Sequence, residues 1–324
     1  MLNLLITGAL GATASAPLDE ISLMRTFRAG SKDEYEVKSH LQIEQRQFGL
    51  NTWIPEDLDV EYKYTVEVKE LKVDDIAKVL YTRPTMTVIE GETFDTPAKT
   101  KVEKVDYKYE LDLSPTNEIL NIKDLNPKKP EEKKDGFWLR SALAAKELAQ
   151  QSLLDAIGGD LYRMALFISD FEGSLDFSPK LPYEEIEKGY KWKRTVSYQP
   201  QRLRGDDNKV AMQRVDYTYE YDGVIESQGK QVHRVKGYVN LDTDYAEYIH
   251  QMMGRTSQQT GLKEVRLKID TLIEFDLDLQ TRKTLRTVAT ANGTMNVVIT
   301  RLPNEPVLES RFKGRTIMRL LSSK

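Results

Sequence analysis

The feature that most constrains this 324-residue sequence is the alternation of apolar and polar side chains over many short stretches. In residues 60–68, Val60, Tyr62 and Tyr64 alternate with charged or hydroxyl-bearing residues. A period of two places the apolar side chains on one face of a β-strand and the polar ones on the other. Such strands are typical of antiparallel sheets, since buried parallel strands are apolar on both faces. The same pattern recurs at residues 35–44, 78–89, 105–113, 190–198, 215–221, 235–241, 273–279, 294–301 and 314–320.

One stretch, residues 137–171, has helical spacing instead. Its apolar side chains recur at steps of three and four, and Gly158 and Gly159 favour a left-handed break between two helices. We therefore predict an α+β fold that is mostly antiparallel β, with two β-rich halves and a central helix pair. The halves are expected to be curved sheets or open half-barrels over residues 17–125 and 173–324, joined by residues 126–172. Short similarities between the halves leave both an internal duplication and the strand order open.

Local signals refine this prediction. The dipeptides Asp222-Gly223 and Asn292-Gly293 are typical of tight hairpin turns. Pro84 is expected to interrupt the strand at residues 78–89, because proline lacks the N–H that a sheet requires. Residues 244–254 have helical spacing that ends at Gly254, and they predict one short helix in the second half.

The first sixteen residues have the pattern of an export signal. A short apolar run precedes two overlapping A-x-A patterns, which end at Ala14 and Ala16. We favour cleavage after Ala14, because Pro17 would follow the other site directly. No Lys or Arg precedes the apolar run, and the alternative is a buried N-terminal strand or helix. The run is too short for a permanent membrane span, so we expect an exported protein, periplasmic or extracellular.

Composition excludes several classes of function. The 47 basic and 51 acidic residues give a net charge of −4, and they are interspersed along the strands, so we expect no nucleic-acid partner. The absence of cysteine excludes disulfides, thiolate metal sites and cysteine nucleophiles. With 40% hydrophobic residues, the chain has enough apolar side chains for a sizeable core.

No motif specifies a reaction. The three histidines are far apart in the sequence, and neither a G-x-S-x-G elbow nor a phosphate-binding glycine loop is present. We therefore predict no catalytic residue, no metal site and no cofactor. Carboxylates at alternate positions share strand faces, as paired glycosidase carboxylates could, although solvated strand faces explain them equally well. These residues are Glu110, Asp112, Glu274, Asp276 and Asp278.

Aromatic and methionine side chains are the remaining candidates for a binding site. A stripe of tyrosines on one strand could line a ligand groove, and the short helix after it could act as a lid over a pocket. Core packing and a helix that covers a sheet edge are the alternative explanations. The candidate ligand-binding residues are Trp138, Tyr217, Tyr219, Tyr221, Tyr245, Tyr248 and Met252.

The segment Leu181-Pro182 followed by Glu187-Lys188-Gly189-Tyr190-Lys191-Trp192 resembles the "LP … vGdtW" start of a strand in a family of exported bacterial β-rich proteins of unknown function. Tyr190 and Lys191 replace the acidic and hydroxyl residues of that motif. The resemblance covers about a dozen residues and implies an envelope or secreted β protein, without assigning any site residue. The expected plan is also similar to that of lipoprotein carriers of the bacterial envelope.

Three functions remain open. The first is an exported, non-enzymatic binding or carrier module, in which curved sheets enclose a hydrophobic small molecule or a lipid. The second is a structural or assembly protein that binds an envelope partner through exposed sheet edges. The third is a hydrolase whose site has no recognisable motif.

Overall fold

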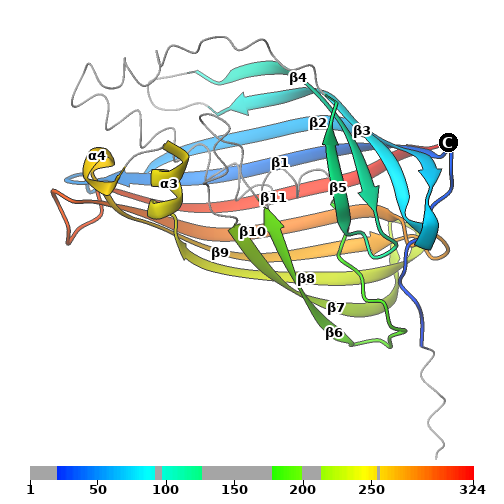
Figure 1. The fold of residues 1–324 in the computed structure, drawn as a ribbon. Helices are drawn as coiled ribbons and strands as arrows, with labels where there is room; N and C mark the ends of the chain where they lie inside the picture. The colour runs from blue at the N-terminus through cyan, green and yellow to red at the C-terminus, as the bar shows by residue number, and fades with distance from the viewer. Residues whose placement is uncertain (1–19, 92–96, 126–176, 199–212, 254–255) are drawn as a thin grey trace, which may run out of the picture.

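The computed structural model describes residues 20–91, 97–125, 177–198, 213–253 and 256–324. These residues form one sheet of eleven antiparallel strands in the order β5-β4-β3-β2-β1-β11-β10-β9-β8-β7-β6 (Figure 1). The strands are β1 (Lys32–Gln47), β2 (Ile54–Leu71), β3 (Ala77–Glu90), β4 (Lys99–Leu113), β5 (Ile119–Asp124), β6 (Lys191–Tyr198), β7 (Gln213–Ser227), β8 (Lys230–Asp244), β9 (Leu262–Leu277), β10 (Thr284–Ile299) and β11 (Leu308–Ser323).

The prediction of mostly antiparallel β structure is confirmed, but the α+β fold class with two separate β-rich halves is wrong. Strands β1–β5 and β6–β11 are each a meander, but β1 pairs with β11 over the length of both strands, so they belong to one sheet. Within the described ranges the α-helices are only α3 (Ala246–Met253) and α4 (Ser257–Thr260). None of the helices there is long and apolar enough to cross a membrane. The expected helix pair at 137–171 and the expected signal at 1–16 lie outside the described residues.

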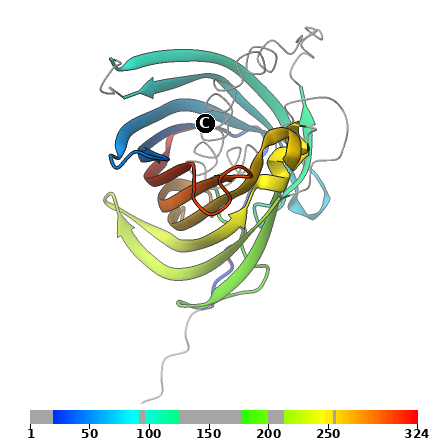
Figure 2. The ribbon, with the colours of Figure 1, turned by 90° about the vertical axis from the view of Figure 1, so that its left-hand side faces the viewer.

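The sheet is curled into a trough. Seen along the strands, its two outer edges, formed by β4–β5 and β6–β7, bend towards the same side (Figure 2). Burial alternates along the strands, as in β1, where Tyr35, Val37 and Leu41 are buried while their neighbours are more exposed. The exposed positions carry cross-strand ion pairs such as Arg319–Glu36, at 2.7 Å. The sequence alternation therefore places an apolar face inside the curl and a charged face outside.

Two predicted hairpin turns are wrong, because both dipeptides lie inside strands. Asn292 and Gly293 lie within β10, where a side chain at Gly293 would collide with the ring of Phe312 on β11. Gly223 lies at a shift of register between β7 and β8, with a φ of 94° that glycine adopts without strain. Pro84 does not end β3, since the strand continues through a register shift against β4. The short helix at 244–254 is confirmed as α3.

Two segments that form no strand, one containing Ile21 and the other Ile186, cover one end of the trough. The backbone of Ile21 pairs with that of Ile186, and the N–H of Thr26 donates to the carbonyl of Thr281 at 2.9 Å. Leu23 is fully buried between them. We call this the clasped end; α3 and α4 lie at the opposite end of the trough (Figure 1).

Candidate ligand-binding face

A wall of tyrosines lines the concave face over β1–β4. The rings of Tyr35 and Tyr64 stack with centroids 5.0 Å apart, and those of Tyr64 and Tyr81 with centroids 5.2 Å apart. Tyr109 continues the row, 6.5 Å from Tyr81. The strand period of two explains the row, since each of these tyrosines occupies an inward position opposite another on the adjacent strand. We call this set of residues, with Tyr62 and Tyr107, the tyrosine wall.

Arg83 is the charged residue within the tyrosine wall. It follows Val79 and Tyr81 at the next inward position of β3, and it is 3% exposed. Its guanidinium carbon lies 4.5 Å from the ring centroid of Tyr62 and 4.6 Å from that of Tyr107. Both distances are typical of cation–π contacts, which favour a guanidinium plane over an aromatic ring.

The phenols around Arg83 stay protonated. Burial raises the pKa of Tyr62 to about 12, although the nearby charge of Arg83 opposes this shift. Burial also raises the pKa of Tyr81 well above its usual value. Both hydroxyls therefore keep their protons at neutral pH and can donate hydrogen bonds.

A second aromatic group lies on the same face across the trough. Trp192 of β6 stacks on Tyr219 of β7 with centroids 5.4 Å apart, and Tyr219 stacks on Tyr217 at 5.7 Å. At the clasped end the Tyr221 hydroxyl and His233 Nδ1 are 2.8 Å apart. Burial, together with the charge of Arg282, lowers the pKa of His233 to about 4, so this imidazole is neutral at physiological pH.

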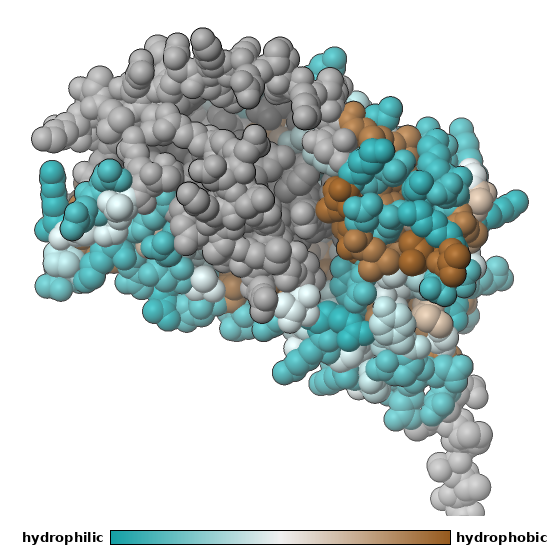
Figure 3. All heavy atoms as spheres, viewed as in Figure 1, coloured by the Kyte–Doolittle hydropathy of each residue, from teal (hydrophilic) through white to brown (hydrophobic). Residues whose placement is uncertain are grey.

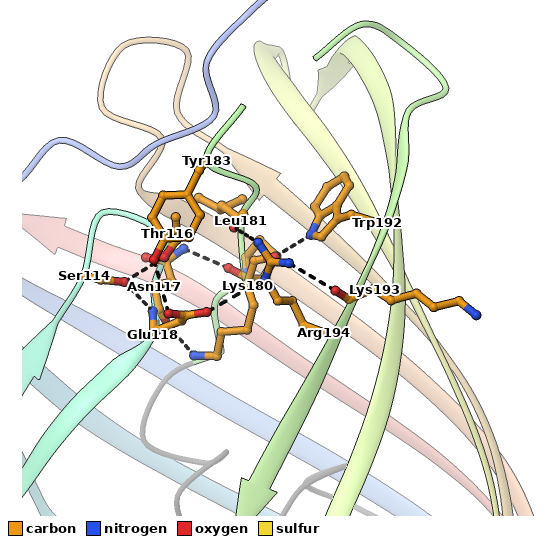
Figure 4. A network of polar contacts seen from close by, with 11 residues as sticks. Ser114, Thr116, Asn117, Glu118, Lys180, Leu181, Tyr183, Trp192, Lys193 and Arg194 are labelled. Atoms are coloured by element: carbon orange, nitrogen blue, oxygen red, sulfur yellow. Dashed lines mark hydrogen bonds and ion pairs between the residues drawn. The ribbon is translucent and has the colours of Figure 1, made fainter. Parts of the chain in front are cut away.

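Polar contacts join the two edges of the sheet at the clasped end (Figure 4). The Leu181 N–H donates to the Thr116 carbonyl at 2.9 Å, which links the segment before β6 to the β4–β5 turn. The side-chain amide of Asn117 donates to the Pro179 carbonyl at 3.0 Å, and the Lys180 ammonium donates to the Asn117 carbonyl. We call this set of contacts the clasp. It holds the outer edges together although β5 and β6 do not pair.

Three further side chains extend the clasp. The guanidinium of Arg194 lies 3.9 Å from the carboxylate of Glu118, and the Trp192 indole donates to the Lys180 carbonyl at 2.7 Å. Arg25, from the N-terminal segment, reaches the Asn117 side-chain oxygen at 3.4 Å. The clasp thus unites residues from three separate parts of the chain.

The structure brings only some of the predicted binding residues together. Tyr217, Tyr219 and Tyr221 share one buried cluster with Trp192, whereas Tyr245, at the start of α3, belongs to the cluster of β1–β4 and β9–β11. Trp138 and the side chains of Tyr248 and Met252 lie outside the described residues. Their role in binding stays a prediction.

Sequence reasoning missed Arg83 and the tyrosine wall as a site. The available signal was a charge at an inward position: Val79 and Tyr81 set the phase of β3, and Arg83 continues it with a guanidinium where an apolar residue is expected. An interruption of this kind marks either a bulge or a functional group.

Four of the five candidate carboxylates have structural partners. Arg234 donates to both Asp276 and Glu274, at 2.6 and 3.1 Å. Asp112 accepts from Lys72 at 2.7 Å, and Asp278 accepts N–H groups of the turn that follows it. Within the described ranges no group of three His, Cys, Asp or Glu residues could hold a metal ion.

Comparisons with known proteins add little to this geometry. No family model matches the sequence, and no curated protein sequence matches it. Solved structures match this chain only at low similarity. Lipovitellin, in a structure of lipid–protein interactions, is 10% identical with a TM-score of 0.43 over 92% of this chain, which spans 26% of the lipovitellin chain.

Two bacterial proteins match over most of both chains. DynF from the dynemicin biosynthesis pathway of Micromonospora chersina is 9% identical, with a TM-score of 0.22 over 94% of this chain and 86% of its own. A DUF1329 family protein from Desulfovibrio piger is 9% identical, with a TM-score of 0.20 over 90% and 85%. Similarities this low carry no conclusion about function.

Proposed function

We propose that this chain is an exported, non-enzymatic binding or carrier protein that holds an apolar ligand, such as a lipid, against the concave face of its sheet. The observation that carries the proposal is the curl itself. The apolar face, with the tyrosine wall on one side and the Trp192 group on the other, is turned inward, and the clasp holds the two edges together at one end. Binding sites for small molecules are commonly concave and lined by aromatic side chains.

The energetics of such a site favour long-chain ligands. Removing one methylene from water contributes about 0.8 kcal/mol, so about ten buried methylenes contribute about 8 kcal/mol before the cost of association. A chain of about four carbons gains only about 3 kcal/mol from burial, about 5 kcal/mol less than the longer chain, so we expect it to bind about a thousandfold more weakly or worse.

The outer surface gives less support to assembly through sheet edges. Among the described residues, the edge strands β5 and β6 are six and eight residues long, and short edge strands are a common protection against pairing between chains. Seen from the side of Figure 1, the described surface is largely hydrophilic, with hydrophobic residues gathered near β5 (Figure 3). An exposed example on β5 is Leu120, at 52%.

The test uses the full chain purified without detergent from its own source. We expect organic extraction and mass spectrometry to release an apolar molecule, and a fluorescent long-chain fatty acid to bind the delipidated protein saturably. Dodecanoic acid should displace the fluorescent probe, whereas butanoic acid should not. Empty preparations together with no saturable binding of the long-chain probe would refute the proposal.

A further inference from the structure

Large apolar side chains are exposed at the end of the trough that carries α3 and α4, which we call the helix end. Phe48, Leu50 and Ile54 lie at or beside the connection between β1 and β2, and Leu302 lies on the connection between β10 and β11. The Phe48 N–H donates to the Val307 carbonyl at 3.0 Å, so the two connections are neighbours, opposite the clasped end (Figure 1). We call Phe48, Leu50, Ile54 and Leu302, which are between 37% and 50% exposed, the apolar tip.

The β1–β2 part of the apolar tip carries no charge. Residues 47–55 include neither an acid nor a base, although 30% of the whole sequence is charged. The connection at 300–307 adds Arg301 and Glu305, whose charges are opposite. Connections between strands usually face water and are rich in small polar residues. Large apolar side chains gathered in such a place are typical of a surface that contacts something other than water.

A layer of paired charges around one tryptophan lies behind the apolar tip. The guanidinium carbons of Arg46 and Arg311 lie 4.9 and 4.5 Å from the ring centroid of Trp53. Arg46 pairs with Glu309 and Arg311 pairs with Glu44, so this layer has no net charge. Tryptophan is enriched where the hydrocarbon of a bilayer meets its headgroups, and arginine can lay its apolar stem there while its charge stays in water. The apolar tip followed by this Trp53 layer therefore has the same order as the layers of a bilayer.

The area of the apolar tip distinguishes a bilayer from a protein partner. A large apolar side chain has an area of roughly 200 Å², so four that are about half exposed present roughly 400 Å². A stable protein interface buries about 800 Å² on each partner, which is about twice this area. A bilayer requires no complementary shape, and a few apolar side chains that enter it are enough for reversible binding.

We propose that the apolar tip is a membrane-docking surface, which enters the outer hydrocarbon of a lipid bilayer while the Trp53 layer stays among the headgroups. This inference goes beyond the proposed function, and the two are compatible. The clasped end, which is covered, faces away from the bilayer, and the concave face of the sheet ends beside it. An apolar ligand then passes between bilayer and protein with little exposure to water.

The test measures binding of the full chain to vesicles of dioleoylphosphatidylcholine by flotation. We expect saturable binding that changes by less than about twofold at high ionic strength, because salt screens exposed charges and does not weaken apolar contacts. Phe48→Ser and Leu50→Ser should each weaken binding about fivefold, the effect of half a large side chain leaving the hydrocarbon, and the double variant about twentyfold. Both side chains are exposed, so urea denaturation should show unchanged stability in all three variants.

Val73→Ser is the matched control. Val73 is also apolar and is more exposed, at 81%, but it lies on the connection between β2 and β3, at the clasped end. This variant should bind vesicles as the wild type does. An equal loss of binding in Val73→Ser and in the double variant would overturn the inference, because the contact would then not be confined to the apolar tip.

Three other results would also overturn it. They are a wild type that does not bind the vesicles, a double variant that binds them unchanged, and binding that disappears at high ionic strength. A dimer in analytical ultracentrifugation that the double variant abolishes would show that the apolar tip joins two copies of the chain instead. All of these results leave the proposed function intact, because binding of the fatty-acid probe is measured without vesicles. Vesicle binding by a chain that binds no fatty-acid probe would refute the proposed function and support the docking surface alone.

Discussion

Asn117 offers a measure of how much one side chain of the clasp stabilises the fold. This residue is fully buried in the β4–β5 turn, with a φ of 61° in the left-handed region. Replacing it with Gly keeps that backbone conformation but removes the hydrogen bond to the Pro179 carbonyl. A lost hydrogen bond that leaves a buried carbonyl unsatisfied costs about 2 kcal/mol, so we expect Asn117→Gly to lower the free energy of unfolding by about that amount.

Asn117→Ala separates the contribution of the side-chain hydrogen bonds from that of the backbone conformation. Alanine also lacks the amide, and its Cβ is strained at positive φ, so we expect a further loss of about 1 kcal/mol relative to Gly. Urea denaturation monitored by far-UV circular dichroism gives all three free energies, provided that the slopes agree. A Gly variant as stable as the wild type would show that the Asn117 side chain contributes nothing to the stability of the clasp. Equal stabilities of the Gly and Ala variants would show that the backbone strain is relieved.

Two further predictions concern the sheet. Gly293→Ala should destabilise the protein by about 3 kcal/mol in the same denaturation assay, because its Cβ would meet the Phe312 ring and a backbone carbonyl; a change below about 0.5 kcal/mol would contradict the close approach of β10 and β11. The pKa of His233 is lowered to about 4, whereas the unfolded chain binds the proton near pH 6.5. The free energy of unfolding should therefore decrease as the pH is lowered from 6.5 to 4. His233→Gln should flatten this part of the stability profile, and an equally steep profile in the variant would contradict the assignment.

Much of the fold follows from the period-two alternation. It places strands and their inward faces correctly, from Tyr35 and Val37 in β1 to Phe275 and Leu277 in β9. It could not show that β1 pairs with β11, because Ser39 and Thr316, whose hydroxyls are 2.9 Å apart, are separated by 277 residues. Two separate sheets and one continuous sheet would show the same alternation along each strand. The local pattern therefore could not distinguish the two architectures, and the prediction of two halves was wrong.

The two hairpin turns were predicted wrongly for a related reason. An Asn-Gly pair is a local signal, whereas the glycine at 293 is required by the ring of Phe312 on another strand. The candidate site shows the same limit. The tyrosine stripe at 217–221 is visible in one strand, but the site around Arg83 draws on β2, β3 and β4, and only their register brings Tyr62 and Tyr107 to the guanidinium.

The position of β11 has a consequence for truncation. Terminal segments are usually peripheral and tolerate shortening. Here β11, the last strand of the described residues, lies between β1 and β10, in the interior of the sheet, and hydrogen-bonds to both. Premature termination before Leu308 would therefore divide the sheet between β1 and β10 and leave both strands with unpaired backbone groups.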